Sequence, residues 1–239
     1  MSKHQSKSEN LAEVAFYVPN VLGYVRFFAI VASWKFAMTD PVKFTILYAI
    51  CYFLGAIDGT VAKVLKQCSF FGAQMDILMN RFATESLIFA VLKLGITNIQ
   101  NDSEKMKFTL LFGSLFLSDF VSNWFQVFSS YLIDQPSHKS SNPVLSILLK
   151  IFTFPVVNFA ITTLSEAYTY SFYLSFFPDQ YKVLSSHPQY ELLLKVALAG
   201  AVLKNIQNFI HLSAASLRIV GIDVKQKNEA AAAQGKKTN

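Results

Sequence analysis

Two aspartates, Asp58 and Asp76, lie inside apolar stretches, where a charged carboxylate is energetically unfavourable. An ionisable side chain at membrane depth costs roughly 2.5–3.5 kcal/mol on insertion scales, so such residues are functional candidates. Around them the chain reads Gly55-Ala-Ile-Asp58-Gly59-Thr-Val-Ala62-Lys63, then eight residues, then Gly72-Ala-Gln-Met-Asp76-Ile-Leu-Met-Asn80-Arg81. This is the densest polar cluster in the sequence. Carboxylate oxygens are the ligands that hard divalent cations prefer, so the cluster points to metal-dependent chemistry.

The spacing indicates how two helices would position these side chains. Residues three or four apart share one face of a helix, so Gly55, Asp58 and Ala62 form one stripe. Asp76 and Asn80 form a second stripe on the following helix. A short connection makes the two helices antiparallel neighbours, and we therefore expect the stripes to converge.

The spacing resembles that of the CDP-alcohol phosphatidyltransferase family, and within it the eukaryotic phosphatidylinositol synthases. The family pattern is Asp-x-x-Asp-Gly-x-x-Ala-Arg, eight residues, then Gly-x-x-x-Asp-x-x-x-Asp. The likeness extends over about Val18 to Arg218. It includes Val18-Pro19-Asn20 with Gly23-Tyr24 and Arg26, Gln67 with Phe71-Gly72-Ala73, Ser137-His138-Lys139 with Asn142-Pro143, and Leu203-Lys204 with Ile210-His211.

The resemblance implies a defined chemistry. Enzymes of this kind join a CDP-linked diacylglycerol to an alcohol, here inositol, and release CMP. Four carboxylates hold divalent Mg or Mn ions that bridge the diphosphate, and the last carboxylate is the base. By the same resemblance Asp58 and Asp76 are metal ligands. The substrate-binding positions that it implies are Gly59, Ala62, Lys63, Gly72, Arg81 and Lys139.

Three positions depart from the family pattern. Gly55 stands where the first carboxylate belongs, and Lys63 replaces the motif arginine. Asn80 occupies the position of the base, but an amide cannot accept a proton near neutral pH. Glu85, nine residues after Asp76, falls on roughly the opposite helix face and does not compensate. We therefore interpret Asp58 and Asp76 as vestigial ligands and expect no catalytic residue and no cofactor; Mg or Mn would be required if the site is active.

Charge counting supports the same interpretation. Two divalent ions bring four positive charges, whereas Asp58 and Asp76 supply two negative ones. In a low-dielectric setting this imbalance should expel at least one metal ion.

Composition predicts an all-α membrane protein. Of the 239 residues 53% are hydrophobic and only 15% are charged, and the apolar residues form long blocks without a one-sided stripe. Because backbone groups in lipid must pair within their own segment, these blocks should be helices. We predict about six transmembrane helices, near 16–38, 43–65, 70–96, 107–132, 145–177 and 190–217. The fifth is longer than one span needs, and Pro155 either kinks it or lets its first turns lie along the membrane interface. Residues 1–15 and 218–239 are predicted to be polar tails around a membrane domain of residues 16–217.

Four further polar residues have two interpretations each. Arg26 faces the polar cavity, as the resemblance implies, or extends its head to the membrane interface. Asn123 makes a polar interhelical contact or has a substrate role. Lys204 and His211, seven residues apart on one face, form a structural hydrogen-bond network or contact a ligand.

The net charge of +6 is best explained by membrane topology. Lysines gather in both tails and in the connections on the same side, which is typical of a cytoplasmic or matrix-type face. The expected partners are membrane lipids and either other membrane subunits or a second copy or paralogue; nucleic acid is not expected. The polar N-terminus does not resemble a secretory signal peptide.

Three functions follow as hypotheses. The first is an inactive phosphatidylinositol synthase-like subunit of a larger membrane assembly, such as a mitochondrial respiratory complex. The second is an active phosphatidyltransferase with a rearranged metal site. The third is a lipid-binding role without turnover. The mitochondrial inner membrane, which the assembly hypothesis favours, and the endoplasmic reticulum are the two expected locations.

Overall fold

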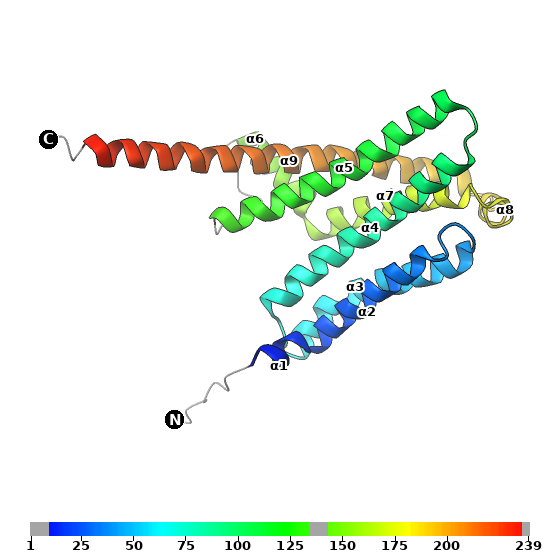
Figure 1. Ribbon diagram of the computed structural model, residues 1–239, viewed down its shortest axis with the longest axis horizontal. Coiled ribbons are helices and arrows are strands. Elements are labelled where there is room, and N and C mark those ends of the chain that lie inside the picture. The colour runs from blue at the N-terminus through cyan, green and yellow to red at the C-terminus, as the bar shows by residue number, and fades with distance from the viewer. Residues whose placement is uncertain (1–9, 134–142, 236–239) are drawn as a thin grey trace. The chain divides into compact units, whose positions relative to one another are not determined.

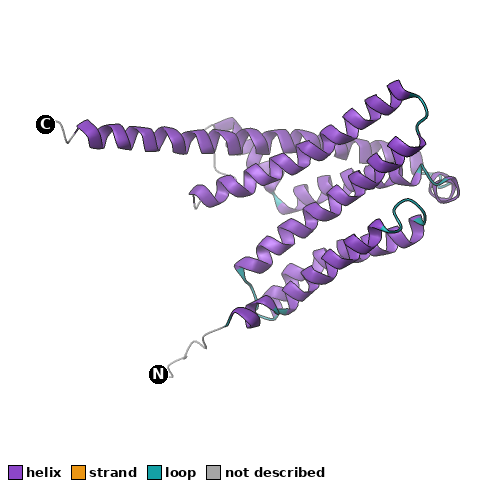
Figure 2. Ribbon diagram, viewed as in Figure 1, coloured by secondary structure: helices purple, strands orange, loops and turns teal. Residues whose placement is uncertain are grey.

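Helices form the regular structure of this chain in the computed structural model, which describes residues 10–133 and 143–235 (Figure 2). No strand occurs in those two ranges. In chain order the helices are α1 (Leu11–Ala15), α2 (Val18–Trp34), α3 (Pro41–Val64), α4 (Phe70–Asn98), α5 (Asp102–Ile133), α6 (Pro143–Thr153), α7 (Pro155–Leu174), α8 (Pro178–Ser185) and α9 (Tyr190–Gly235) (Figure 1). The prediction of an all-α protein is confirmed.

The chain divides into two units, Met1–Leu94 and Gly95–Asn239, here called the N-terminal unit and the C-terminal unit. The first contains α1 to α3 and most of α4. The second contains the last residues of α4 and all of α5 to α9.

Three helices are long and apolar enough to cross a membrane: residues Pro41–Val64, Asp102–Leu132 and Tyr190–Ala232. The pair Val144–Thr153 and Pro155–Leu174 makes a fourth if it counts as one span. All six predicted blocks contain helices, but the helices of two blocks are not long or apolar enough to count as membrane spans. Helix α2 has 17 residues, below the ~20 that a span needs. Helix α4 carries four charged side chains, Asp76, Arg81, Glu85 and Lys93, which lower its hydropathy.

The fifth predicted block is broken in two at the predicted proline. Helix α6 ends at Thr153, α7 begins at Pro155, and the two are bent by 70°. Proline has no N–H to donate to the preceding turn, and its ring clashes there, so a continuous helix is interrupted. The predicted kink is confirmed.

The last helix is longer than the sequence suggested. The predicted span ends at residue 217, whereas α9 continues to Gly235. Alanine has the highest intrinsic helix propensity, and Ala230–Ala233 lie in this extension. Lys225 and Glu229 add an ion pair at 3.9 Å one turn apart. Most of the segment predicted as a polar tail is therefore an exposed helix.

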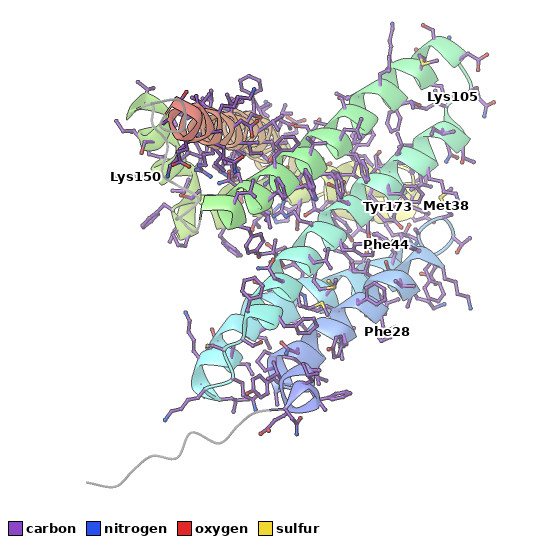
Figure 3. The ribbon with its side chains drawn as sticks, turned by 60° about the vertical axis from the view of Figure 1, so that its left-hand side comes forward. Phe28, Met38, Phe44, Lys105, Lys150 and Tyr173 are labelled. Carbon is purple, nitrogen blue, oxygen red and sulfur yellow. The ribbon has the colours of Figure 1, made fainter. Side chains whose placement is uncertain are left out.

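In the N-terminal unit α2 packs along α3 and touches α4. Gly23 lets the side chain of Met75 approach α2 closely, and the rings of Phe27 and Trp34 lie against Phe82. Outward faces are apolar as well, as expected of helices in lipid (Figure 3). Phe44 is fully buried, whereas Phe28 is 66% exposed.

In the C-terminal unit α9 is the common partner, packed against α5, α6 and α7. Leu149 of α6 forms a buried cluster with Ile210 and Ala214 of α9. On α7, Leu164 fills the space beside Gly200 of α9. A Cβ atom on Gly200 would overlap the Cβ atom of Leu164 and lie 3.3 Å from its backbone Cα and C atoms.

We expect Gly200→Ala to destabilise the C-terminal unit by about 1–3 kcal/mol, because the added methyl forces α7 and α9 apart. Gly221→Ala is the matched control on the same helix, since a Cβ there meets nothing within 4 Å. That control should be neutral or stabilising by about 0.5–1 kcal/mol. Thermal unfolding in detergent, followed by circular dichroism, measures both; equal midpoints would contradict close packing at Gly200.

Candidate functional site

The turn between α3 and α4 brings the two predicted stripes together in the N-terminal unit. Lys66 adopts a left-handed conformation with φ of 56°, which ends α3. The Ser69 Oγ then accepts the Gly72 N–H at 3.0 Å and starts α4. The Gln67 Oε1 accepts the Val18 N–H at 2.9 Å, so the beginning of α2 is tied to the same turn.

A pocket of about 240 Å³ opens beside this turn. Its lining combines Pro19 with residues of the turn and of both stripes: Asp58, Gly59, Ala62, Lys63, Gln67, Cys68, Ser69, Gly72, Ala73, Met75 and Asp76. The structure thus gathers both predicted metal ligands and four of the predicted substrate-binding residues at one pocket.

The guanidinium of Arg26 lies between the two aspartates. Its Nη1 donates to Asp58 Oδ2 at 2.5 Å and to Asp76 Oδ1 at 3.0 Å. Its Nη2 donates to Asn80 Oδ1 at 2.5 Å. Arg26 is 1% exposed and Asp58 is 6% exposed, so the centre of this cluster is shielded from solvent. The sequence allowed the Arg26 side chain to face the polar cavity or to extend to the membrane interface. The structure places it in the polar site.

Asn80 bridges the cluster through both ends of its amide. While its Oδ1 accepts from Arg26, its Nδ2 donates to Asp76 Oδ1 at 2.9 Å. A carboxylate at this position could accept the first bond but has no proton for the second.

Gly55 lies directly against the guanidinium. A Cβ atom at this position would lie 2.7 Å from Cζ of Arg26, 3.1 Å from Nη1, and closer still to Nη2. Any side chain at residue 55 therefore conflicts with Arg26 where it lies.

The residues present do not fit a two-metal centre. Asp58 and Asp76 bring two negative charges, Arg26 already neutralises one, and both carboxylates accept hydrogen bonds from it. Within residues 10–133 and 143–235, no group of three or more His, Cys, Asp or Glu side chains comes together as a metal site. Adding two divalent ions to this cluster would leave a large uncompensated positive charge beside the buried Arg26 and Asp58.

One predicted substrate-binding residue in the described part of the chain does not line the pocket. Arg81 follows Asn80 on α4 but does not line the pocket. Lys139 lies outside the described residues. Conversely, the site residues predicted from the sequence do not include Arg26, although an arginine within the first apolar block was the available signal.

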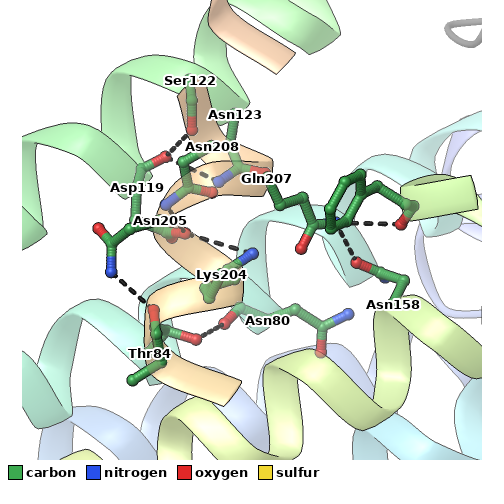
Figure 4. Close-up of polar contacts among 12 residues, drawn as sticks. Asn80, Thr84, Asp119, Ser122, Asn123, Asn158, Lys204, Asn205, Gln207 and Asn208 are labelled. Carbon is green, nitrogen blue, oxygen red and sulfur yellow. Dashed lines mark hydrogen bonds and ion pairs between the residues drawn. The ribbon is translucent and has the colours of Figure 1, made fainter. Parts of the chain in front are cut away.

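A second buried polar cluster lies in the C-terminal unit (Figure 4). The Asp119 carboxylate lies 3.4 Å from Lys204 Nζ and accepts from Asn208 Nδ2 at 3.1 Å. Asn123 donates to the Asp119 backbone oxygen on its own helix at 2.7 Å. Gln207 donates to Asn158 Oδ1 at 2.8 Å and to the Phe152 carbonyl at 3.1 Å. Lys204 thus takes part in a network that joins α5 to α9.

The long apolar helices, three or four of which can each cross a membrane, are those of a multi-pass membrane protein. The chain belongs to the CDP-alcohol phosphatidyltransferase family, whose sequence profile matches residues 16–173.

Its similar proteins include enzymes of phosphatidylinositol synthesis. The chain is 28% identical to the CDP-diacylglycerol–inositol 3-phosphatidyltransferase of Saccharomyces cerevisiae over 231 residues, 96% of this chain and 98% of that protein. It is 28% identical to the enzyme of the same name from Rattus norvegicus over 218 residues, 90% and 96% of the two chains. It is also 28% identical to CDP-diacylglycerol–inositol 3-phosphatidyltransferase 1 of Arabidopsis thaliana. That match covers 152 residues, which are 64% of this chain and 62% of that protein. No solved structure matches the chain.

Proposed function

We propose that this protein is a catalytically inactive phosphatidylinositol synthase-like membrane protein. The observation that carries the proposal is the state of the carboxylate set: Asp58 and Asp76 are both engaged by Arg26, while Gly55 and Asn80 stand at the other two positions. The metals that the family chemistry requires would have to displace a buried arginine and then bind with half of their ligands.

The missing base supports the same proposal. In the enzymes that the chain resembles, a carboxylate at the position of Asn80 takes a proton from the attacking hydroxyl. The Asn80 amide cannot do so. Loss of a general base alone lowers a rate by about 10²–10⁴-fold. The pocket that remains suits a lipid headgroup held without turnover, which is consistent with a structural role in a membrane assembly.

The alternative is an active phosphatidyltransferase with a rearranged site. The observation in its favour is the pocket itself, which keeps Asp58, Gly59, Ala62, Gly72 and Asp76 along one lining. Such an enzyme would need a base other than Asn80 and a cation arrangement other than two divalent ions.

A transferase assay decides between these two functions. Purified protein in mixed micelles receives CDP-diacylglycerol, labelled inositol and Mn²⁺ or Mg²⁺, with the yeast relative as positive control. We expect product formation at least about 10²-fold below that control. Metal-dependent product that disappears in Asp76→Ala, but persists when the exposed Asp223 is changed to alanine, would overturn the proposed inactivity.

The assembly part of the proposal has its own test. Membranes solubilised in mild detergent are separated on a native gel, and the tagged protein is located by immunoblotting. We expect migration in a complex much larger than a dimer; a monomer or simple dimer would contradict a structural subunit. Fractionation of the same cells assigns the compartment, the mitochondrial inner membrane or the endoplasmic reticulum.

A further inference from the structure

We propose that the guanidinium of Arg26 is the resident cation of this site and takes the place of the divalent ions. Gly55 and Asn80 are then parts of one metal-free cluster and not merely lost ligands. This inference deepens the proposed inactivity by naming what fills the site, and the two can fail separately.

The first argument is electrostatic. Asp58 is buried, and Asp76, whose side chain is 41% exposed, shares the same donor on Arg26, so a buried and a half-buried carboxylate converge on one guanidinium. Like charges brought together in low dielectric need a counter-charge. Arg26 supplies it from within the fold, and its planar fork reaches both aspartates and Asn80 without any ion from solution.

The second argument is steric. The atoms of the guanidinium lie where the first carbons of a side chain on residue 55 would be. A carboxylate at residue 55 and Arg26 in its present position therefore exclude one another. The exchange of a carboxylate for glycine removes a metal ligand and, in the same step, makes room for the arginine.

The third argument concerns hydrogen bonds. With an arginine at the centre, residue 80 must accept from Nη2 and also satisfy Asp76 Oδ1, which lies 2.9 Å from its amide nitrogen. Asparagine does both, whereas aspartate would add a third negative charge facing Asp76. Gly55, Asn80 and Arg26 are thus chemically consistent with one another and inconsistent with metal binding.

The test uses the full-length protein and Mn²⁺ as the probe. Wild-type protein should show no change in thermal midpoint with added Mn²⁺. In Arg26→Met the carboxylates of Asp58 and Asp76 lose their internal cation and become available to a metal ion. We expect Mn²⁺ at about 100 times its Kd to raise the midpoint of this variant by about 5–10 °C.

Two controls define the specificity of that shift. Arg26→Met/Asp76→Asn removes a carboxylate and should abolish the effect of Mn²⁺. Arg218→Met removes an arginine from the C-terminal unit and should leave the protein insensitive to Mn²⁺. Absence of any Mn²⁺ effect in folded Arg26→Met, or an equal effect in Arg218→Met, would overturn the inference.

Electron paramagnetic resonance keeps the inference testable if Arg26→Met does not fold. Wild-type protein should leave the signal of free Mn²⁺ undiminished, and Arg26→Gln, which keeps a hydrogen-bond donor, should reduce it. Wild-type protein that binds Mn²⁺ but makes no product would overturn the resident arginine and leave the proposed inactivity intact. Product formation by wild-type protein that binds no Mn²⁺ would overturn the proposed inactivity and leave the resident arginine intact.

Discussion

Gly55→Ala is expected to lower the unfolding free energy of the N-terminal unit by about 2–5 kcal/mol. A methyl group at this position overlaps the Arg26 guanidinium, which must then move and lose bonds to Asp58, Asp76 or Asn80. Each hydrogen bond to a charged group is worth about 1.5–3 kcal/mol, and a displaced buried arginine leaves Asp58 without its closest cation.

Gly59→Ala is the matched control one turn further along α3. A Cβ atom at Gly59 meets nothing within 4 Å, so this change should be neutral or stabilising by up to about 1 kcal/mol. Because α3 loses one glycine in both variants, helix propensity cancels and the difference between them reports the space beside Arg26.

The measurement can be confined to the N-terminal unit. The chain has two tryptophans, and Trp34 lies against Phe82 in that unit. In a Trp124→Phe background, Trp34 fluorescence during titration with a denaturing detergent follows this unit. If Gly55→Ala and Gly59→Ala unfold at the same detergent concentration, the guanidinium does not occupy the space beside residue 55.

Lys204→Met is expected to destabilise the C-terminal unit by about 3–5 kcal/mol. Asp119 is 3% exposed and faces the Lys204 ammonium at 3.4 Å. Removing one partner of a buried ion pair leaves the other charge in a place where water cannot solvate it. Asn208 still donates to Asp119, but an amide dipole replaces only part of a full positive charge.

Two further variants separate the ion pair from general effects of losing a lysine. Lys204→Met/Asp119→Asn removes both charges and should recover most of the stability, because a buried pair replaced by neutral groups is often close to neutral. Lys225→Met, at an exposed position of the same helix, should change stability by less than about 0.5 kcal/mol. Trp124 fluorescence in a Trp34→Phe background reports the C-terminal unit; a double variant as unstable as Lys204→Met would contradict the pairing.

The proposed inactivity and the proposed resident arginine together would give a physical reason for a phosphatidyltransferase-like fold without the reaction. A carboxylate cluster that depends on bound metal is stable only when the metal is present. In the proposed arrangement an arginine within the chain supplies the charge permanently, and the N-terminal unit does not depend on an ion for its stability. That property suits a structural membrane protein.

Local patterns in the sequence were sufficient for much of the fold. Long apolar blocks predict helices because backbone groups in lipid must bond within their own segment. The break at Pro155 follows from a missing donor in the same way. Motif spacing also predicts that Asp58 and Asp76 meet, since a short turn forces consecutive helices together. Helix ends were less predictable: an alanine-rich segment extends α9 to Gly235, beyond the predicted end of the apolar block at residue 217.

Only the tertiary structure shows what lies between the aspartates. Helical periodicity gives the face on which Arg26 lies, but the partners of that face are 32, 50 and 54 residues away. No local rule specifies such contacts, because they depend on how α2, α3 and α4 pack. In the sequence Gly55 is a missing ligand; in the folded chain it is also the space that a buried guanidinium requires.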